Sequence, residues 1–340
     1  MTARFVIVGA GAIGCHIGGR LATAGNAVVF VARPRIAAAL ESQGLAVSDL
    51  DGFRAVLPPT SLVVGNVAEA AAGAAPSLVL LCTKGGATAE AAAAIGRAFP
   101  SGTPVLSLQN GIDNVARIRT AAPGLAALAG MVPFNVVLGP DDNGLLTAHR
   151  ATSGELHAED HPACRAVADV FARAGLPLRL VADMASVQWG KLLFNLNNPV
   201  NALAGLPLRE ELLDARYRQA LAALQAEALA VMAKAGIRPA RIGPAPPRLV
   251  PAILRLPTWA FRRIAAGMLK IDPAARSSMW DDLQAGRPTE IDDLCGAIVR
   301  LAAAEGLPAP KNAAMIELVK QAGGSPRYSG AELLHQLGIR

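Results

Sequence analysis

A glycine-rich segment near the start of the chain has the spacing of a phosphate-binding turn. The apolar residues 4–8 lead into the motif GAGAIG, and helix-forming residues follow. The first glycine of such a motif permits a tight turn, the second lets the backbone approach a pyrophosphate closely, and the third lets the helix pack against the strand. The N–H groups that begin the helix face the phosphates. We expect a dinucleotide to bind here, the alternative being an ordinary glycine-rich turn, and the residues concerned are Gly9, Ala10, Gly11, Ala12, Ile13 and Gly14.

The residue after the second apolar segment bears on which dinucleotide is bound. Residues 27–32 form this segment, and Arg33 follows where an NAD site usually carries Asp or Glu. An acidic side chain accepts hydrogen bonds from the ribose 2′-OH, whereas a guanidinium suits a 2′-phosphate, with Arg35 nearby to assist. The sequence therefore favours NADPH as the cofactor. The alternative is that Arg33 is a solvated surface residue.

Two more polar residues follow apolar segments of the same half. Lys84 comes after residues 77–82, and Asn110 comes after residues 104–108. Ligands of open α/β sheets bind at the carboxyl ends of the strands, so both residues are candidates for the site. Lys84 could contact a phosphate, a ribose hydroxyl or a substrate carboxylate, and Asn110 could fix the nicotinamide or the substrate. The alternatives are a solvated lysine and a simple turn at Asn110.

A polar group on an apolar stretch of the second half suits acid catalysis. Reduction of a ketone by hydride builds negative charge on the carbonyl oxygen, so a proton donor or cation must be held there. If residues 189–198 form one helix, Lys191, Asn195 and Asn198 share a narrow face at about 100° per residue. Such groups are costly among leucines unless they are paired or functional. The alternative is a structural polar network between helices.

A further polar stretch covers residues 277–292. It contains Ser278 and the run GRPTEID. Thr289 has the features of a helix N-cap, with Asp292 three residues later, which places Glu290 in the first turn, where the helix dipole stabilises a carboxylate. On spacing alone, Glu290 is a capping charge.

The elements that must position these residues fall into two classes. Apolar strands alternate with helices in the first half, which indicates a parallel sheet covered on both faces. Residues 126–137 and 145–149 have an irregular, turn-rich character that suggests an antiparallel extension. Helical periodicity dominates later, over residues 189–198, 212–235, 279–284 and 292–305. We predict an α/β chain with a Rossmann-type doubly wound parallel sheet in residues 1–182 and a mainly α-helical C-terminal domain in residues 183–340.

Composition narrows the classes of partner. The chain of 340 residues has a net charge of +6, which suits anionic ligands. Only 4% of the residues are aromatic and the arginines are scattered, so no nucleic-acid partner is expected. The four cysteines lack CxxC spacing, which predicts buried thiols and no metal site. With neither a signal-peptide pattern nor a bilayer-spanning run, we expect no membrane association and a cytoplasmic location.

Several motifs together resemble the ketopantoate reductase (2-dehydropantoate 2-reductase) family, with match points from residue 6 to about residue 311. These motifs are GAGAIG at 9–14, TK at 83–84, LQNG at 108–111, Lys191 with Asn195 four residues later, SM at 278–279, GRPTEID at 286–292 and GLPAP at 306–310.

The resemblance implies a reaction and residue roles. The family reduces 2-dehydropantoate to (R)-pantoate with NADPH, a step in pantothenate and coenzyme A synthesis. By resemblance, Lys191 is the proton donor, Asn195 and Ser278 hold the substrate, and Asn110 touches both cofactor and substrate. Glu290 would lie at the interface of cofactor and active site and modulate Lys191.

The chain departs from the family pattern in the second substrate amide. The family places it two turns after the lysine, a position that is Pro199 here. We assign this role to Asn198 on the helical angle, with Asn197 and Asn201 as alternatives.

A second departure is the proline-rich segment 242–270, which is longer than in compact family members. It could form a loop, a lid over the substrate or a contact in a homodimer. Two alternatives to the function also stay open. One is a related NADP-dependent dehydrogenase for another small 2-keto or hydroxy acid, and the other is a non-catalytic NADPH-sensing regulatory protein.

Overall fold

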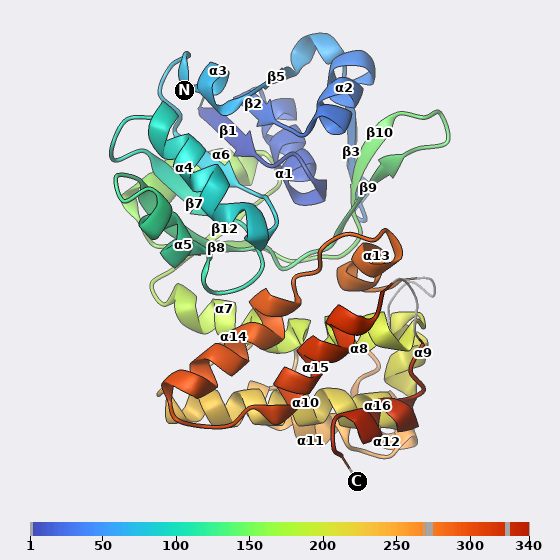
Figure 1. The fold of residues 1–340 in the computed structure, drawn as a ribbon. Coiled ribbons are helices and arrows are strands. Elements are labelled where there is room, and N and C mark those ends of the chain that lie inside the picture. Colours follow the sequence, from blue (N-terminus) through green and yellow to red (C-terminus); the bar gives the residue numbers. More distant parts are fainter. Residues whose placement is uncertain (1–2, 268, 270–274, 324–326, 340) are drawn as a thin grey trace. The chain divides into compact units, whose positions relative to one another are not determined.

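The computed structural model describes residues 3–267, 269, 275–323 and 327–339. The chain divides into two compact units, Met1–Met184 (unit 1) and Ala185–Arg340 (unit 2), which Figure 1 draws as ribbons. Unit 1 holds the sheets and unit 2 is helical, so the predicted fold class is confirmed. The predicted domain boundary after residue 182 falls shortly before this division.

Unit 1 is built around an eight-stranded sheet with the order β12-β11-β8-β7-β6-β1-β2-β5. The strands from β8 to β5 in that order are parallel, whereas β11 pairs with β8 in the antiparallel direction. The bounds are β1 (Arg4–Val8), β2 (Ala27–Val31), β5 (Val63–Gly65), β6 (Leu78–Leu81), β7 (Pro104–Ser107), β8 (Ala126–Met131), β11 (Leu156–Glu159) and β12 (Leu178–Val181).

A second sheet of four strands lies in the same unit, in the order β4-β3-β10-β9. Its strands are β3 (Leu45–Asp49), β4 (Arg54–Leu57), β9 (Val136–Pro140) and β10 (Leu146–Arg150). The expectation of irregular structure over residues 126–137 and 145–149 is therefore wrong, because most of these residues belong to β8, β9 and β10. The predicted antiparallel extension is present as the pairing of β9 with β10.

Two hydrophobic cores cover the two faces of the large sheet. In β1, Phe5 and Ile7 face one core and Val6 and Val8 face the other, as the period of two in a strand requires. Phe5 also meets Phe171 edge to face, with ring centroids 5.6 Å apart. Burial of such a ring stabilises the folded state by about 2–3 kcal/mol. Strand β1 is therefore held by packing on both of its faces.

The helices of unit 1 pack on these faces (Figure 1). Buried residues of α1 and α6 belong to the first core, and those of α3, α4 and α5 to the second. The bounds are α1 (Ala12–Thr23), α2 (Pro34–Gln43), η1 (Pro59–Ser61), α3 (Val67–Ala71), η2 (Gly85–Ala87), α4 (Thr88–Ala98), α5 (Asn114–Ala121) and α6 (Pro162–Arg173).

Unit 2 is arranged around the long helix α10, along which α11, α14, α15 and α16 pack (Figure 1). The bounds are α7 (Met184–Asn195), α8 (Asn197–Ala204), α9 (Leu208–Leu213), α10 (Ala215–Lys234), η3 (Pro247–Leu249), α11 (Val250–Leu254), α12 (Thr258–Ile264), α13 (Ser278–Gln284), α14 (Ile291–Ala304), α15 (Pro310–Gln321) and α16 (Gly330–Gln336).

Two predicted helices of unit 2 are each divided in the structure. The predicted helix 189–198 is interrupted at Leu196, which lies between α7 and α8. The predicted helix 212–235 is interrupted at Asp214, whose extended backbone ends α9 and whose side chain caps the N-terminus of α10. A helical hydrophobic pattern continues across both joints, so periodicity alone did not reveal them.

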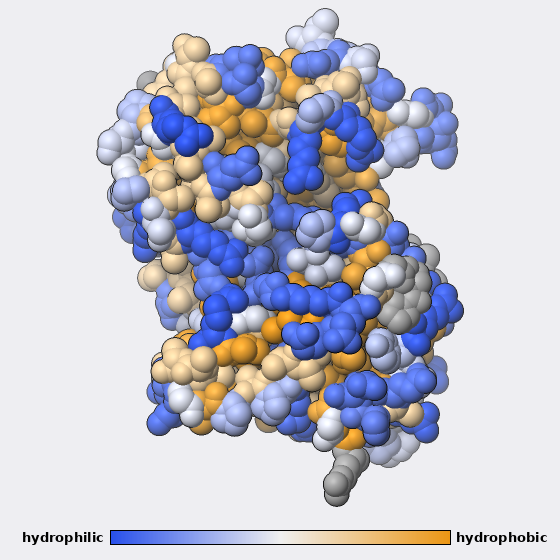
Figure 2. Space-filling model, viewed as in Figure 1, coloured by the Kyte–Doolittle hydropathy of each residue, from blue (hydrophilic) through white to orange (hydrophobic). Residues whose placement is uncertain are grey.

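The proline-rich segment 242–270 is largely helical where the structure describes it, containing η3, α11 and α12, while Lys270 lies outside the described residues. Exposed apolar side chains of this segment include Leu249, Trp259 and Ile264. Figure 2 shows hydrophilic residues distributed over the visible face of both units. Among the described residues, no helix is sufficiently long and apolar to cross a membrane.

Candidate active site

The glycine-rich turn follows β1 and has the backbone geometry that its spacing predicts. Gly9 has a φ of +100°, a region that favours glycine. A Cβ atom on Gly14 would lie 2.2 Å from the Gly9 oxygen, so helix α1 can approach the turn only without a side chain there. The turn is also tied to the end of β2, because the N–H groups of Gly9 and Ala10 donate to the Val31 oxygen at 3.0 and 3.2 Å.

Gly11 differs from its neighbours because no protein atom crowds it. A Cβ atom built there would meet nothing within 4 Å, although Gly11 directly precedes α1 as its N-cap. Neither folding nor packing therefore demands glycine at this position, whereas close approach of a ligand would. The first N–H groups of α1 have no intrahelical acceptors, and Gly11 has no side chain to cap them. The segment 9–14 thus fits a pyrophosphate.

Arg33 lies just beyond β2, the strand that pairs with β1. Its backbone oxygen accepts hydrogen bonds from the Ile36 and Ala37 N–H groups, which starts α2. The side chains of Arg33 and Arg35 are both exposed. Within the described part of the chain, neither forms an ion pair or a side-chain hydrogen bond, so both guanidinium groups are available to an anion.

Lys84 and Asn110 follow β6 and β7, which continue the same row of parallel strands. Lys84 is exposed and Asn110 is half-buried. Together with segment 9–14 and Arg33, they follow the carboxyl ends of the neighbouring strands β2, β1, β6 and β7. The structure therefore brings the predicted residues of unit 1 to one edge of the sheet.

A buried polar network that sequence reasoning missed joins two of these loops. Gln109 Nε2 donates to the Thr83 oxygen at 2.9 Å and to Thr88 Oγ1 at 2.8 Å. Thr88 Oγ1 donates to Asn114 Oδ1 at 2.9 Å, and Asn114 Nδ2 donates to the Asn110 oxygen at 2.7 Å. Gln109 therefore holds the loops that carry Lys84 and Asn110 in a fixed relation. Its place in LQNG was visible, but its partners depend on tertiary contacts.

In unit 2, Lys191 lies on α7, where Trp189 and Gly190 before it and Leu192 and Leu193 after it are buried, and it is itself half-buried. Burial lowers the pKa of the Lys191 ammonium from 10.5 to about 8. Desolvation disfavours the charged form, so the ammonium loses its proton more readily than a solvated lysine. A lysine with a pKa near neutrality is suited to give up a proton during a reaction.

Asn195 is the last residue of α7, four residues after Lys191, and its side chain is buried. The i, i+4 spacing places it on the same helix face as the lysine. The interruption at Leu196 means that this face does not continue into α8 as on a straight helix. The argument that placed Asn198 with Lys191 and Asn195 assumed one unbroken helix, and the structure has two helices here.

The three candidate second amides, all on α8, have different surroundings. Asn201 is fully buried, its Nδ2 donates to the Leu206 oxygen at 3.0 Å, and its Oδ1 accepts from the Ser277 N–H at 2.8 Å. Asn197 Nδ2 donates to Glu211 Oε2 at 3.1 Å. Asn198 is half-buried; its backbone oxygen accepts from Ser277 Oγ at 3.1 Å, and its side chain makes no hydrogen bond within the described part of the chain. Asn201 is thus a structural residue, and the Asn198 side chain is the least committed of the three.

Glu211 on α9 is a buried carboxyl group that sequence reasoning did not single out. Its Oε2 accepts from Asn197 and, at 3.3 Å, from Asn201. Burial raises the pKa of Glu211 to about 8, although the two amide hydrogen bonds oppose the shift. Within the described residues, Glu211 Oε1 and Asn197 Oδ1 are buried without hydrogen-bond partners. Protonation of Glu211 adds a donor to this acceptor-rich network.

Ser278 is the first residue of α13 and is exposed. The preceding Ser277 caps the helix through Oγ, which accepts from the Trp280 N–H at 3.2 Å. Arg276 Nη1 donates to the Gly205 oxygen at 2.7 Å, and its guanidinium lies over the Trp280 ring. These contacts hold the start of α13 against α8, so the structure brings Ser278 to the helix that carries Asn198.

Glu290 is the N-cap residue of α14, so the prediction that Thr289 caps this helix is wrong. The Glu290 side chain makes no capping hydrogen bond, while its backbone oxygen accepts from the Asp293 and Leu294 N–H groups. Asp292 and Asp293 supply the acidic charges of the first turn instead. The sequence suggested a capping role for the Glu290 carboxylate, and the structure shows that this side chain does not cap α14.

The cysteines are free thiols, and three of the four are buried. Burial raises the pKa of Cys15 to about 12 and that of Cys164 to about 11, which makes them unreactive. Among the described residues, no group of three His, Cys, Asp or Glu side chains could hold a metal ion.

These features define an α/β dinucleotide-binding unit followed by a helical unit with a depressed-pKa lysine. The chain belongs to the ketopantoate reductase family: residues 5–160 match the model described as "Ketopantoate reductase PanE/ApbA", and residues 183–323 match the model of its C-terminal part. The predicted family is confirmed, and with it the class of the protein, an oxidoreductase.

Relatives and solved structures agree with this assignment. A 2-dehydropantoate 2-reductase of Mesorhizobium japonicum is 28% identical over 94% of this chain and 97% of its own. One of Pyrococcus abyssi is 28% identical over 93% and 97%. A PanE/ApbA family ketopantoate reductase from Ralstonia eutropha superposes with a TM-score of 0.78 at 29% identity, over 96% of this chain and 100% of that one. A D-mandelate dehydrogenase at 21% identity and a TM-score of 0.76, with coverage of 96% and 100%, shares the fold.

Proposed function

We propose that this protein reduces 2-dehydropantoate to (R)-pantoate with NADPH. The observation that carries the proposal is Lys191, a half-buried lysine with a pKa of about 8 and with Asn195 one turn later on the same helix. The curated relatives named 2-dehydropantoate 2-reductase, matched over nearly their whole length, support the choice of substrate.

The residues of unit 1 fit the cofactor of this reaction. The open backbone at Gly11 and the start of α1 would hold the pyrophosphate, and Arg33 would pair with a 2′-phosphate. Lys84 and Asn110 would contact the cofactor from the next two loops, with Asn110 also reaching the substrate. NADPH, when bound, supplies the hydride.

The residues of unit 2 would bind and protonate the substrate. Lys191 donates a hydrogen bond to the keto oxygen and releases its proton as negative charge builds there, and its pKa of about 8 keeps it mostly protonated at neutral pH. Asn195, Asn198 and Ser278 orient the carboxylate and hydroxyl ends of the keto acid. We assign Glu290 to the junction of cofactor and substrate, where its charge modulates Lys191.

The proposal also covers the setting of the reaction. A reductase of this kind acts in pantothenate and coenzyme A synthesis, and we expect it in the cytoplasm.

Oxidation of NADPH with 2-dehydropantoate, measured beside NADH, tests the proposal. A matched control is 3,3-dimethyl-2-oxobutanoate, which lacks only the substrate hydroxyl group. We expect a higher kcat/KM with NADPH than with NADH, and a higher value for 2-dehydropantoate than for the control acid. Preference for another keto acid would indicate a related dehydrogenase. NADPH binding without oxidation by any keto acid would instead support a regulatory protein.

A further inference from the structure

Unit 2 contains a buried carboxyl group to which the proposed reaction gives no role. Glu211 lies on α9 and has no exposed surface. Its Oε2 atom accepts from Asn197 Nδ2 at 3.1 Å and from Asn201 Nδ2 at 3.3 Å. Both amides belong to α8 and are four residues apart, so they share a face of that helix. One carboxyl oxygen is thus bonded to two successive turns of α8.

The surroundings of Glu211 favour the neutral acid over the carboxylate. Helix α8 has no titratable side chain, and Glu211 forms no ion pair within the described residues. The titratable groups on α9, α10 and the segment before α13 are Arg209, Glu210, Asp214, Arg216, Tyr217, Arg218 and Arg276. Of the two arginines that are not on the surface of α9 or α10, Arg218 donates to the Leu212 oxygen and Arg276 to the Gly205 oxygen. Burial raises the pKa of Glu211 to about 8, and only the two amide hydrogen bonds oppose this shift.

Two buried oxygen atoms of this network lack a donor. Within the described part of the chain, Glu211 Oε1 and Asn197 Oδ1 have no hydrogen-bond partner. They are the second atoms of the same two planar groups that the bond from Asn197 Nδ2 to Glu211 Oε2 already joins. In the ionised state both atoms are acceptors, and a buried acceptor without a donor is costly. One proton on Glu211 Oε1 removes both costs, because the O–H group can donate to the amide oxygen.

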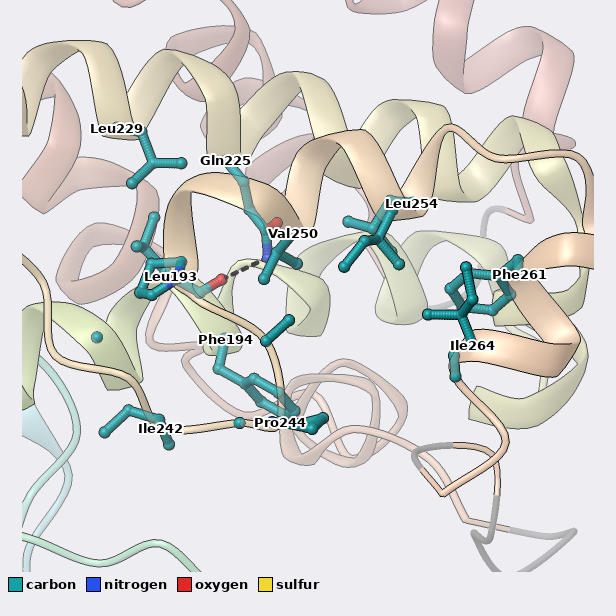
Figure 3. A pocket seen from close by; sticks show the side chains of 16 residues that line it. Leu193, Phe194, Gln225, Leu229, Ile242, Pro244, Val250, Leu254, Phe261 and Ile264 are labelled. Carbon is teal, nitrogen blue, oxygen red and sulfur yellow. Dashed lines mark hydrogen bonds between the residues drawn. The ribbon is translucent and has the colours of Figure 1, made fainter.

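The network lies on the α8 side of the joint at Leu196. On the other side, Gln225 Nε2 of α10 donates to the Leu193 oxygen at 3.0 Å, as Figure 3 shows. This bond ties the last turn of α7 to α10. The helix that carries Lys191 is therefore held independently of Glu211.

The two bonded amides fix the rotation of α8 about its axis. At about 100° per residue, the Asn198 side chain is offset from them by about 100° and about 60°, so its direction follows from theirs. Asn201 also holds the start of α13, because its Oδ1 accepts from the Ser277 N–H at 2.8 Å. Glu211 is thus connected to both candidate substrate groups of this region, the side chains of Asn198 and Ser278.

We propose that Glu211 is a neutral carboxylic acid whose O–H group donates to Asn197 Oδ1, which closes a ring of two hydrogen bonds with the Asn197 amide and positions α8 for substrate binding. Glu211 is a positioning residue, since it acts through α8 and does not touch the keto acid. The ring itself is independent of the reaction, whereas its effect on substrate binding rests on the proposed function.

Infrared spectroscopy of the full chain tests the protonation state. At about pH 6, an ordinary glutamate with a pKa of 4.5 is ionised, whereas Glu211 should be protonated. A protonated carboxyl group has a C=O stretch above the amide band, and a carboxylate does not. We expect this stretch in the unaltered chain and its loss in Glu211→Gln, while Glu210→Gln, an exposed change at the neighbouring position, keeps it. Absence of the stretch, or its survival in Glu211→Gln, would overturn the proposal.

Exchange of the acid and the amide tests the ring. In Glu211→Gln an NH₂ group replaces the O–H donor, so this variant should fold with nearly the same denaturation midpoint at about pH 6. Asn197→Asp places a second acid in the ring and should lower the midpoint. Adding Glu211→Gln to Asn197→Asp should restore most of this loss, because the acid and the amide have then changed places. A double variant no more stable than Asn197→Asp would contradict the ring, as would failure of Glu211→Gln to fold.

Steady-state kinetics test the positioning role. Glu211→Met fills similar space without hydrogen bonds and should lower kcat/KM for 2-dehydropantoate at least about tenfold, chiefly through KM, with NADPH affinity within about twofold. The conservative variant Glu211→Gln should recover most of this loss. Equal losses in the Met and Gln variants would refute the positioning role. If the unaltered chain does not reduce 2-dehydropantoate, the proposed function fails, while the infrared and stability results still decide whether the ring exists.

Discussion

The backbone N–H of Ser277 donates to Asn201 Oδ1 at 2.8 Å, and this bond, with that of Ser277 Oγ to the Asn198 oxygen at 3.1 Å, joins the start of α13 to α8. Asn201 is fully buried and also bonds to Leu206 and Glu211. Ser278, whose hydroxyl group is a candidate for binding the substrate, is the next residue in the chain. The position of that hydroxyl therefore depends in part on a fully buried amide.

Asn201→Leu should consequently impair catalysis without weakening cofactor binding. Loss of the tether displaces Ser278, and displacement of a substrate-positioning group costs about 10- to 100-fold in kcat/KM for 2-dehydropantoate. Arg262→Ala, an exposed change elsewhere in unit 2, is the control, because Ser277→Ala would also remove the Oγ cap of α13. Steady-state kinetics and NADPH titration separate the two effects. Equal losses in the two variants would show that the tether is not what matters.

Lys191→Ala should lower turnover by at least about 100-fold, the scale of a lost general acid, while NADPH still binds. Lys234→Ala, which alters an exposed lysine at the end of α10, should leave turnover unchanged. Because the proton donor must be protonated and its pKa is about 8, kcat/KM for reduction should fall about tenfold per pH unit above about pH 8. Near-normal turnover in Lys191→Ala would refute the assignment.

Substitutions of two glycines in the first turn should have different effects, one on stability and the other on NADPH binding. Gly14→Ala forces a Cβ atom against the Gly9 oxygen and should lower the free energy of unfolding by about 1–3 kcal/mol. Gly11→Ala meets no protein atom and should leave stability nearly unchanged, while weakening NADPH binding where the pyrophosphate approaches. Thermal unfolding and NADPH titration measure the two quantities. Unaltered NADPH affinity in Gly11→Ala would argue against a pyrophosphate at this turn.

Arg33→Ala should affect NADPH selectively. Loss of a charge-assisted contact to the 2′-phosphate should raise KM for NADPH by about 10- to 100-fold and leave KM for NADH within about twofold. Arg262→Ala, an exposed change in unit 2, provides the control. If KM rises equally for NADPH and NADH, Arg33 does not contact the 2′-phosphate.

Glu211 should make stability depend on pH. The pKa of its carboxyl group is about 8 in the folded chain and near 4.5 when exposed, so the folded state binds a proton that the unfolded state has lost between these values. The free energy of unfolding should therefore fall as the pH rises from about 5 to 8. Glu211→Gln, which mimics the neutral acid, should flatten this dependence in chemical denaturation. A pH profile unchanged by the substitution would place the ionisation elsewhere.

Much of the cofactor half was predictable because its signals are local. Strands β1, β2, β6 and β7 are short apolar runs, and GAGAIG follows the first of them, so each candidate residue could be placed at a strand end. The small sheet was less visible, since β3 and β10 pair across a long stretch of sequence. Gln109 was likewise visible only as part of a motif, because its role consists of contacts with residues from another loop.

The substrate half was harder to predict because its polar groups act through tertiary contacts. Lys191 and Asn195 were recognisable as polar residues one turn apart on an apolar helix. The joint at Leu196 has no glycine, and Pro199, in the first turn of α8, was the one sign in the sequence that a new helix begins there. Glu211 resembled an ordinary helix-start acid until its burial against Asn197 and Asn201 was known.

The joint at Leu196 also bears on how specificity can diverge in evolution. A residue inserted between Lys191 and Asn195 would rotate Asn195 by about 100° around the helix axis, so the two side chains would no longer share a face. A residue gained or lost at the joint leaves α7 intact and changes only the stretch leading to Asn198. If Lys191 is the proton donor and Asn198 binds the substrate, as proposed, a length change at this joint would alter substrate fit while leaving the proton donor in place.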